Sequence, residues 1–342
     1  MSIGGSSYQA VDSYLAIFRE ATWGTLQHSA ATNATAIEFL SCNVKTAIKS
    51  ESLNTLGFRG KTKRVQLEKS VAGSLETHLS PTESPLLMAV GLGGSIVTTS
   101  ITGAFAHSLT VGDVVTSSIP SVSFNFMKGK TAWNYVGGRV DSMVISANVG
   151  EVAKITYEMI FKDSTIGATD IQSSLSYTSV LPFTFVNGVY RYNSTEAAAD
   201  TTTAQECILG FELTVNNNLK SDTDARCLGS NIIAVLPPTR REIEFKVRQR
   251  FDTTTTYSRF TSGTVGSVEL KFTGASITAE YNQDMEIRLP KVYYKTGDTE
   301  VTSPEDLLTT ELDFDVLLDT MTSSGREMGV TIINNVNSYT SL

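Results

Sequence analysis

The side chains that most often carry out chemistry in proteins are few and scattered in this chain. Its three histidines are His28, His78 and His107, and none of them falls in the spacing of a serine hydrolase, a zinc protease or a Cys/His pair. An isolated histidine is most simply a surface or strand residue. We therefore expect no catalytic site, and the sequence does not predict an enzyme.

The spacings that would bind phosphate or metal ions are incomplete as well. The glycines of 91–94 lack the G-x-G-x-x-G pattern that cradles a pyrophosphate. Residues 222–224 begin like a calcium loop, but no glycine stands at its sixth position and no glutamate at its twelfth. Cys42, Cys207 and Cys227 are odd in number and form no C-x-x-C pair, which predicts reduced thiols. No cofactor and no metal ion is expected.

The overall composition limits the size, partners and compartment of the protein. With 342 residues, 41% of them hydrophobic, the chain is long enough for two domains of ~150 residues, each with its own core. The net charge of −8 argues against a protein that grips nucleic acid, because such proteins neutralise phosphates with Lys and Arg. Residues 1–11 do not read as a secretion signal, and no apolar run approaches the ~20 residues that cross a bilayer. We expect a soluble protein that is made in a cytoplasm and has no membrane partner.

The second half of the sequence repeats the pattern of the first. Residues 40–91 and 211–263 carry similar residue types at matching positions. The matched pairs are Cys42 with Leu213, Val44 with Val215, Ile48 with Leu219 and, after a one-residue insertion, Val71 with Ile243, Leu75 with Val247, Leu79 with Phe251 and Gly91 with Gly263. A repeat of this length predicts two related domains, whose product is a surface or a wall rather than one catalytic pocket.

Most of the chain shows the period of β-strands. Charged residues alternate with apolar ones from 241 to 252, which predicts a strand with one buried and one wetted face. The residues of this candidate wetted strand face are Glu242, Glu244, Lys246, Arg248 and Arg250. The range 151–162 alternates in the same way, and shorter runs occur at 121–126, 211–215, 268–272 and 277–289. Short helices are expected at 85–91, 257–263 and 304–308.

These patterns predict an all-β, antiparallel fold with short helices, divided into two domains. The boundaries that we expect are an N-terminal arm (1–35), a first β domain (36–165), a linker (166–180), a second β domain (181–322) and a C-terminal tail (323–342). The linker is rich in Ser, Thr, Gly and Asp. The arm and the tail have little core pattern, so we expect neighbouring subunits to order them.

Two long polar segments, 50–64 and 222–239, stand at matching positions of the two halves, between neighbouring strands. Segments of that length in a compact domain usually have a function. We expect their basic side chains to contact acidic patches on another subunit or ring. The candidate contact residues are Leu53, Arg59, Lys61, Lys63, Arg64, Arg226, Asn231 and Arg240. The alternative is that each segment is a solvated hairpin tip.

Several short motifs follow one another between about residues 15 and 319. The first is the stretch 17–25, Ile-Phe-Arg-Glu-Ala-Thr-Trp-Gly-Thr. The others are 73–76 followed by 85–91, 135–140 with 146–151, then 211–218, Gly229, and Leu289-Pro290 before a closing strand. In the order of these motifs the chain resembles the phage tail tube proteins, the major tail protein family.

The resemblance implies two tandem tail-tube domains, each an antiparallel β-sandwich or rolled sheet that completes a β-barrel on oligomerisation. In such proteins the subunits pair strand to strand into rings, and stacked rings form a hollow conduit for DNA. Ring closure would also remove the open sheet edges. If both halves are tube domains, three chains make a pseudo-hexameric ring, and six chains per ring is the alternative. An acidic or neutral lining would repel DNA phosphates.

The expected partners follow from the same resemblance. They are other copies of the chain, other tail proteins, and DNA in transient, non-specific passage. The expected location is the tail of the phage virion, after assembly in the cytoplasm of a bacterial host. Two other classes stay open, namely another β-rich virion or filament protein (a tail terminator, a decoration protein or a pilus-like subunit) and a carbohydrate-binding module.

Overall fold

The chain folds into antiparallel β-sheets with few helical residues. A computed structural model describes residues 12–26, 35–54, 56–112, 119–129, 131–167, 175, 177–194, 203–299, 307–318 and 326–339. Every strand pair among these residues is antiparallel, and two α-helices accompany the strands. None of the helices in these ranges is long and apolar enough to cross a membrane. The predicted all-β class with short helices is confirmed.

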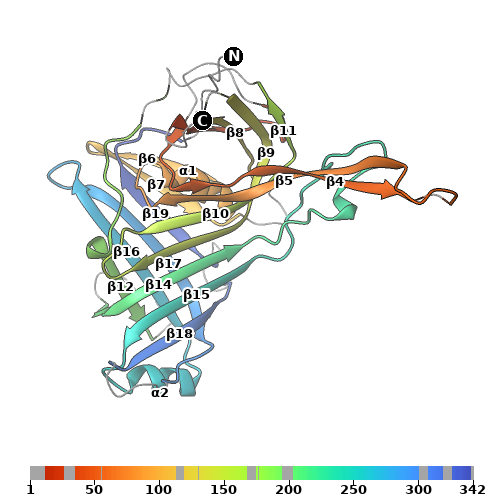
Figure 1. Cartoon of the computed structure of the whole chain (residues 1–342). Helices are drawn as coiled ribbons and strands as arrows, with labels where there is room; N and C mark the ends of the chain where they lie inside the picture. Colours follow the sequence, from red (N-terminus) through yellow and green to blue (C-terminus); the bar gives the residue numbers. More distant parts are fainter. Residues whose placement is uncertain are drawn as a thin grey trace, which may run out of the picture.

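The larger layer is a sheet that runs through both halves of the chain (Figure 1). Its strands, in spatial order, are β4 (Lys45–Leu53), β5 (Lys63–His78), β10 (Lys154–Phe161), β9 (Thr131–Asn148), β14 (Ile208–Asn216), β15 (Glu242–Arg250) and β18 (Thr309–Val316). The short strand β3 (Ser41–Cys42) precedes β4 along the same side of β5. Because β9 and β14 belong to different halves, their pairing joins the halves within one sheet.

A second layer packs against the first and encloses the core. Its strands are β6 (Ile96–Ile101), β7 (Ala104–Thr110), β19 (Gly329–Asn334), β17 (Asn282–Tyr294), β16 (Gly266–Ser276), β12 (Gly188–Asn193) and β13 (Gln205–Glu206). The end of β17 also pairs with β18, which links the layers at one corner.

The core between the layers is continuous. Phe211 of β14 contacts Phe272 of β16, and Tyr190 of β12 contacts Phe245 of β15, with ring centroids 6.0 and 6.2 Å apart. One cluster of buried apolar residues extends through both halves. This arrangement differs from the two separate cores expected from chain length, because the β9–β14 pairing carries the same buried face from one half into the other.

A smaller sheet covers one end of the first half. Its strands are β2 (Thr35–Ile37), β1 (Tyr14–Arg19), β8 (Val122–Lys128), the beginning of β9, and β11 (Asp163–Ile166). The strand β9 leaves this sheet and enters the larger one at Gly137 and Gly138. Gly137 has a φ of +68°, and a Cβ on Gly138 would collide with the ring of Phe161. Glycine is required at this bend because it has no Cβ and tolerates a positive φ.

The strands β4 and β5 extend beyond the body of the molecule as a long hairpin (Figure 1). Their pairing continues to Leu53 and Lys63, so both ends of the segment expected to be a loop at 50–64 are strand. In the second half the matching segment, 217–241, has no long strand and contains only the short 3-10 turn η4 (Thr223–Ala225). The two halves therefore differ most at the segments that the sequence had set in parallel.

Two of the expected helices are confirmed. They are α1 (Ser84–Leu92) and α2 (Thr255–Ser262), and each ends at a glycine with positive φ. All residues of α1 are buried, whereas only Thr256 of α2 is buried. The third expected helix, at 304–308, falls largely outside the described residues. A 3-10 turn, η3 (Phe185–Asn187), precedes β12.

Both ends of the chain contribute buried strands, unlike the arm and tail that were expected. Leu15 and Ile17 of β1 are fully buried, as is Val330 of β19. The strand β19 pairs with both β7 and β17, and Tyr339 beyond it is also buried. The apolar runs in these strands are short: β1 buries the consecutive residues 14–18, which show no alternation, and β19 alternates over only six residues. The expected linker at 166–180 lies partly outside the described residues.

Candidate functional site

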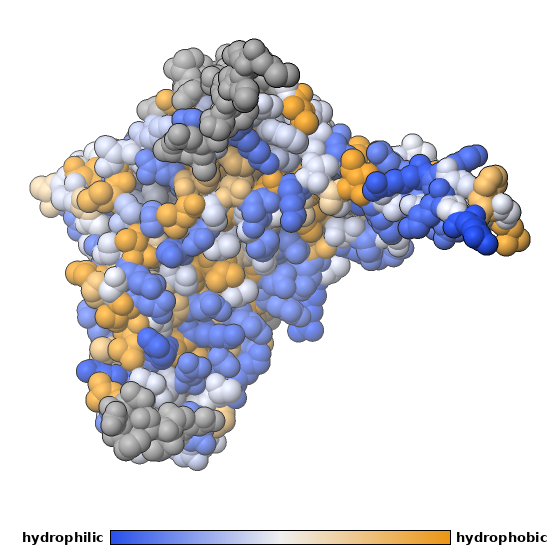
Figure 2. Space-filling model, in the orientation of Figure 1, coloured by the Kyte–Doolittle hydropathy of each residue, from blue (hydrophilic) through white to orange (hydrophobic). Residues whose placement is uncertain are grey.

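One face of the larger sheet is covered by polar side chains from both halves, and we call it the wetted face. Along β15 the residues Ile243, Phe245 and Val247 are buried, and the charged residues between them are exposed, as the sequence predicted. Beyond β15, its charged residues include Lys45, Glu76, Lys154, Glu158, Glu212, Glu311, Asp313 and Asp315. Hydrophilic residues dominate the surface over β14, β15 and β18 in Figure 2.

Acidic side chains outnumber basic ones on the wetted face, and basic groups stand beside carboxylates. Lys246 lies directly opposite Asp313 on the neighbouring strand. Lys295 Nζ lies 3.0 Å from Asp315 Oδ1 and 3.3 Å from Glu244 Oε1. These two carboxylates raise the pKa of Lys295. Opposite charges across strands add a modest stabilisation to the sheet, and the unmatched carboxylates leave the face with an excess of negative charge.

The two halves join through a regular pair of strands at the centre of the wetted face. The register of β9 and β14 places Leu213 opposite Ile145, and both side chains are fully buried on the core side. Just after β14, Asn217 Nδ2 donates to the carbonyl oxygens of Gly91 (2.7 Å) and Val140 (3.0 Å). The junction between the halves is thus built with the same packing and backbone pairing as any other pair of strands in this sheet.

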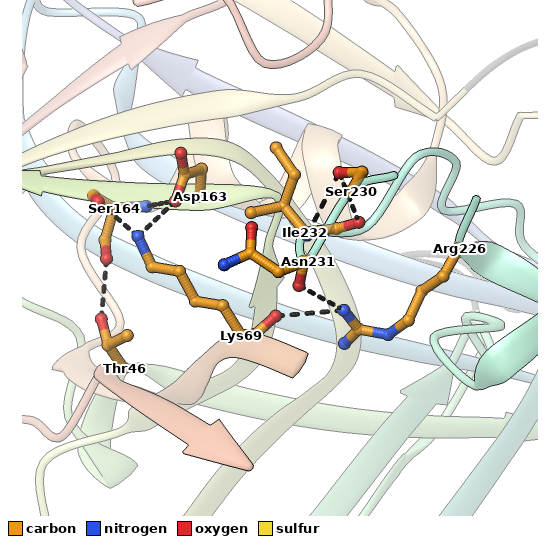
Figure 3. Close-up of polar contacts among 8 residues, drawn as sticks. All are labelled: Thr46, Lys69, Asp163, Ser164, Arg226, Ser230, Asn231 and Ile232. Carbon is orange, nitrogen blue, oxygen red and sulfur yellow. Dashed lines mark hydrogen bonds and ion pairs between the residues drawn. The ribbon is translucent and has the colours of Figure 1, made fainter. Parts of the chain in front are cut away.

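The base of the long hairpin is held by a set of polar contacts centred on Lys69 (Figure 3). Lys69 Nζ donates to Asp163 Oδ1 at 2.5 Å and to the carbonyl oxygen of Ser164 at 2.7 Å. The hydroxyls of Thr46 and Ser164 hydrogen bond at 2.7 Å. These contacts tie β4 and β5 to the short strand β11.

The loop of the second half supports the same hairpin from another direction. The amide of Lys69 donates to the carbonyl oxygen of Asn231 at 2.8 Å. Arg226 donates to the carbonyl oxygens of Lys69 (3.2 Å) and Asn231 (2.9 Å), and its guanidinium lies 3.8 Å from a carboxylate oxygen of Glu68. Of the candidate contact residues, Arg226 and Asn231 therefore hold the hairpin of their own chain, and contacts of theirs with another subunit stay a prediction.

The remaining candidate contact residues are exposed, and all but Arg240 lie on the hairpin. Leu53, Arg59, Lys61, Lys63 and Arg64 are all on the outer part of the hairpin. Beside them, the sequence analysis missed Leu56 and Phe58, which are 102% and 71% exposed at the turn. The segment 50–64 is polar in overall composition, and that composition hides the two apolar side chains at its turn.

Arg240 is exposed and lies in a different part of the molecule. Its carbonyl oxygen accepts a hydrogen bond from Asn218 Nδ2 at 2.9 Å, at the end of the second-half loop. The candidate residues consequently form one group on the hairpin and a second, smaller group at its base and beyond.

The N-terminal motif acts through a buried carboxylate that sequence reasoning did not single out. Glu20 accepts hydrogen bonds from the hydroxyls of Ser121 and Ser123 and from the amides of Gly24 and Gly137. A carboxylate satisfied by four donors binds three segments together, since these donors come from the motif itself, from β8 and from the bend of β9. The motif is thus structural.

The tryptophan of the same motif completes this junction. Trp23 Nε1 donates to the carbonyl oxygen of Gly137 at 3.0 Å. The Lys162 ammonium and the Arg139 guanidinium lie 4.6 and 5.3 Å from the centre of the indole ring, within range of a cation–π contact. The spacing Glu-x-x-Trp-Gly in the sequence was the only signal that pointed to this cluster.

The described part of the chain offers no group of three or more His, Cys, Asp or Glu side chains arranged to hold a metal ion. Cys42, Cys207 and Cys227 are free thiols. Burial raises the pKa of the Cys42 thiol above its usual value.

Comparison with known protein families gives a match over most of the chain. The model of a protein family described as phage tail tube protein matches residues 10–316. A search of curated proteins finds no match.

Proposed function

This chain belongs to the phage tail tube protein family, and we propose that it assembles into stacked rings that form a hollow tube, through which DNA passes to the host. It is a structural protein of the virion tail, and its family is not an enzyme family. Its partners would be further copies of itself and other tail proteins, with assembly in the cytoplasm of the bacterial host.

The observation that most supports a tube is the wetted face, which continues from one half to the other across the β9–β14 junction. Its reverse side is buried core, so the wetted face is the side of this sheet that is free to border a water-filled lumen. Carboxylates such as Glu212, Glu242 and Glu311 are exposed on it. A lining with excess negative charge repels phosphate, so a DNA duplex would pass without sticking.

Three chains per ring are favoured because each chain carries two joined sets of strands. If each half supplies one tube domain, three chains give six domains around the lumen. A head-to-tail contact repeated around an axis closes into a ring when the rotation between subunits closes. Rings of six chains remain the alternative, in which one half would decorate the exterior.

The long hairpin would connect a subunit to its neighbour or to the next ring. Its base is fixed by Lys69 and Arg226, so the outer part projects in a defined direction. Leu56 and Phe58 expose apolar surface at the tip, and basic residues such as Arg59 and Lys61 surround them. An exposed apolar tip with a basic rim suits a contact with an acidic, partly apolar surface of another copy.

Electron microscopy of the purified protein tests the tube. We expect hollow filaments above a critical concentration, and a mass per ring of three 36.9 kDa chains by scanning transmission mass measurement. A mass of six chains per ring would overturn the stoichiometry alone. A monodisperse monomer at every concentration and salt would overturn the tube, and discrete rings that never stack would favour a tail terminator.

Shortening the hairpin tests its role. Replacing residues 54–62 by a two-residue turn should leave folded subunits that no longer form long tubes, because the tip is lost while the clamp at Lys69 remains. A matched control is Val97→Ser, which removes an exposed apolar side chain from β6 in the other layer. Tubes of normal length from the shortened variant would refute the connecting role.

A further inference from the structure

The larger sheet contains the same order of strands twice. In the first half the order is β3 and β4, β5, β10 and β9, and in the second half it is β14, β15, β18 and the end of β17. The last strand of each set contains one extra residue relative to its neighbour, and it does so at the same place. In the first half, the register between β9 and β10 shifts between Glu158 and Met159. In the second half, the amides of Lys295 and Thr296 both donate to the carbonyl oxygen of Asp313 on β18.

Aligning these irregularities matches Met143 of β9 with Gly297, and Val144 with Asp298. The packing of the helices agrees with this match. Met143 lies against Gly91 of α1, and Phe260 of α2 fills the space beside Gly297. In both halves, the helix therefore packs on the core side of the same position in the last strand.

The other end of each set can be matched through its partner strand. Lys45 stands opposite Ala72 of β5, and Thr214 stands opposite Glu244 of β15. The sequence repeat matches Val71 with Ile243, and therefore the next residues, Ala72 and Glu244, with each other. Because Lys45 and Thr214 stand opposite these two matched residues, Lys45 corresponds to Thr214. This assignment is two residues away from the one that sequence alone suggested, and a shift of two keeps every side chain on the same face.

Each set has one edge without a neighbouring strand among the described residues. One edge is formed by residues 44–47, at the start of β4, and the other by 296–299, which follow β17 beside β18. In the first edge the carbonyl oxygen of Val44 accepts from Lys128 Nζ (3.1 Å) and from the Tyr135 hydroxyl (3.3 Å), so the pairing of Val44 would have to displace these contacts. A hydrogen bond of 2.6 Å between the hydroxyls of Thr299 and Thr310 holds the second edge against β18. The two edges lie beside β5 and β18, toward opposite ends of the strand order of the larger sheet. Inside the chain, the strands that correspond to them, β14 and β9, pair with each other.

We propose that the edge 44–47 of one copy pairs antiparallel with the edge 296–299 of a second copy, in the register of the internal β9–β14 pair. The proposal rests on the ring assembly proposed above and names its contact surface. Because Thr214 lies opposite Val144 inside the chain, Lys45 lies opposite Asp298 between copies. The partner is thus a second copy of this chain, bound head to tail.

Charge and exposure at the two edges fit this pairing. Lys45 and Asp298 are both exposed, and opposite charges placed directly across an antiparallel pair attract. The Oδ1 atom of Asp298 accepts from the amide of Thr299 at 2.8 Å, and a carboxylate has further lone pairs for a lysine. Open edges invite uncontrolled pairing, and a repeated head-to-tail contact that closes into a ring removes both of them.

Disulfide trapping tests the register. In a background with Cys42→Ser, Cys207→Ser and Cys227→Ser, the pair Lys45→Cys and Asp298→Cys would place two Cα atoms about 4.5 to 5.5 Å apart, within reach of a disulfide. Oxidised tubes should then give a ladder of covalent oligomers on a denaturing gel. The pair Lys45→Cys and Thr296→Cys, two positions out of register, should give much less.

The internal junction supplies the positive control. The pair Thr214→Cys and Val144→Cys occupies the corresponding positions within one chain, and it should form a disulfide without changing the chain's mass on the gel. Its formation shows that the cysteine-free background folds. Tubes in the microscope without intermolecular cross-links at 45 and 298 would overturn the proposed register while leaving the tube intact, whereas absence of tubes from the wild-type protein would overturn the proposed function itself.

Charge reversal gives a second readout that needs no cysteine. Lys45→Asp or Asp298→Lys alone should raise the critical concentration for assembly by up to about fivefold, the scale of a single cross-strand charge pair. The double variant Lys45→Asp with Asp298→Lys should recover most of the loss. Equal losses in the single and double variants, with unchanged unfolding of the subunit, would contradict the pairing of these two residues.

Discussion

Replacing Glu83 by glutamine should stabilise the subunit at neutral and alkaline pH but not at acid pH. The side chain of Glu83 is buried at the start of α1, and its Oε2 accepts from the amide of Glu38 at 3.2 Å. Its Oε1 is buried without a hydrogen-bond partner among the described residues. Burial, assisted by the nearby carboxylate of Glu38, raises the pKa of Glu83 from 4.5 to about 7.

The sign and size of the effect follow from this shift. Because the pKa in the folded state lies above that in the unfolded state, the protonated carboxyl favours folding. The stability that the subunit gains from the protonated Glu83 is fully present below pH 4.5 and is lost as the pH rises through about 7. At ~1.4 kcal/mol per unit of pKa, the ionised carboxylate costs about 3 kcal/mol above that range. Glu83→Gln is neutral at every pH and keeps an acceptor for the Glu38 amide.

Urea unfolding of dilute subunits, followed by tryptophan fluorescence between pH 4 and 9, measures the difference. We expect Glu83→Gln to match the wild type near pH 4 and to exceed it by up to about 3 kcal/mol at pH 8. Glu38→Gln, the matched control, removes only the neighbouring charge and should give a smaller gain with the same sign. A difference between variant and wild type that does not change with pH would refute the reasoning.

Three further substitutions test the fold. Gly137→Ala should destabilise by more than the ~1–2 kcal/mol of a left-handed alanine, because its Cβ would also crowd Lys162 and Trp23. Gly150→Ala, with a φ of +88° and open space around it, should cost only the backbone term in thermal unfolding. Leu213→Ala should cost about 2 to 5 kcal/mol at the buried junction of the halves, against almost nothing for the fully exposed Leu228→Ala. Lys69→Met should speed hydrogen exchange of residues 45–53, since it removes the contacts with Asp163 and Ser164, and unchanged exchange would contradict the clamp.

Several features of the molecule were predictable from local patterns. The alternation along β15 identified one strand of the wetted face, and the glycine-terminated runs located α1 and α2. The repeat between the halves predicted the shared order of strand, strand and helix. The hairpin broke the parallel, because 50–64 and 222–239 have similar polar compositions, but the ends of the first pair as strands and the second contains no strand.

Other features could not be read from any local pattern. Glu20 and Lys69 gain their roles from donors and acceptors that lie more than 90 residues away, at Gly137 and at Asp163. The strands β1 and β19 fall in the arm and tail that neighbouring subunits were expected to order, because a short apolar run near a chain end carries no sign of which sheet will receive it.

The sequence by itself determined which side of strands such as β10 and β15 is buried, since that depends on a period of two along a few consecutive residues. The tertiary structure decided which strands are neighbours, and above all that β9 of the first half pairs with β14 of the second. The backbone N–H and C=O groups of a strand can hydrogen bond to those of any other strand. The choice of neighbour is therefore made by the packing of the whole core, and the same choice leaves two edges of the sheet open.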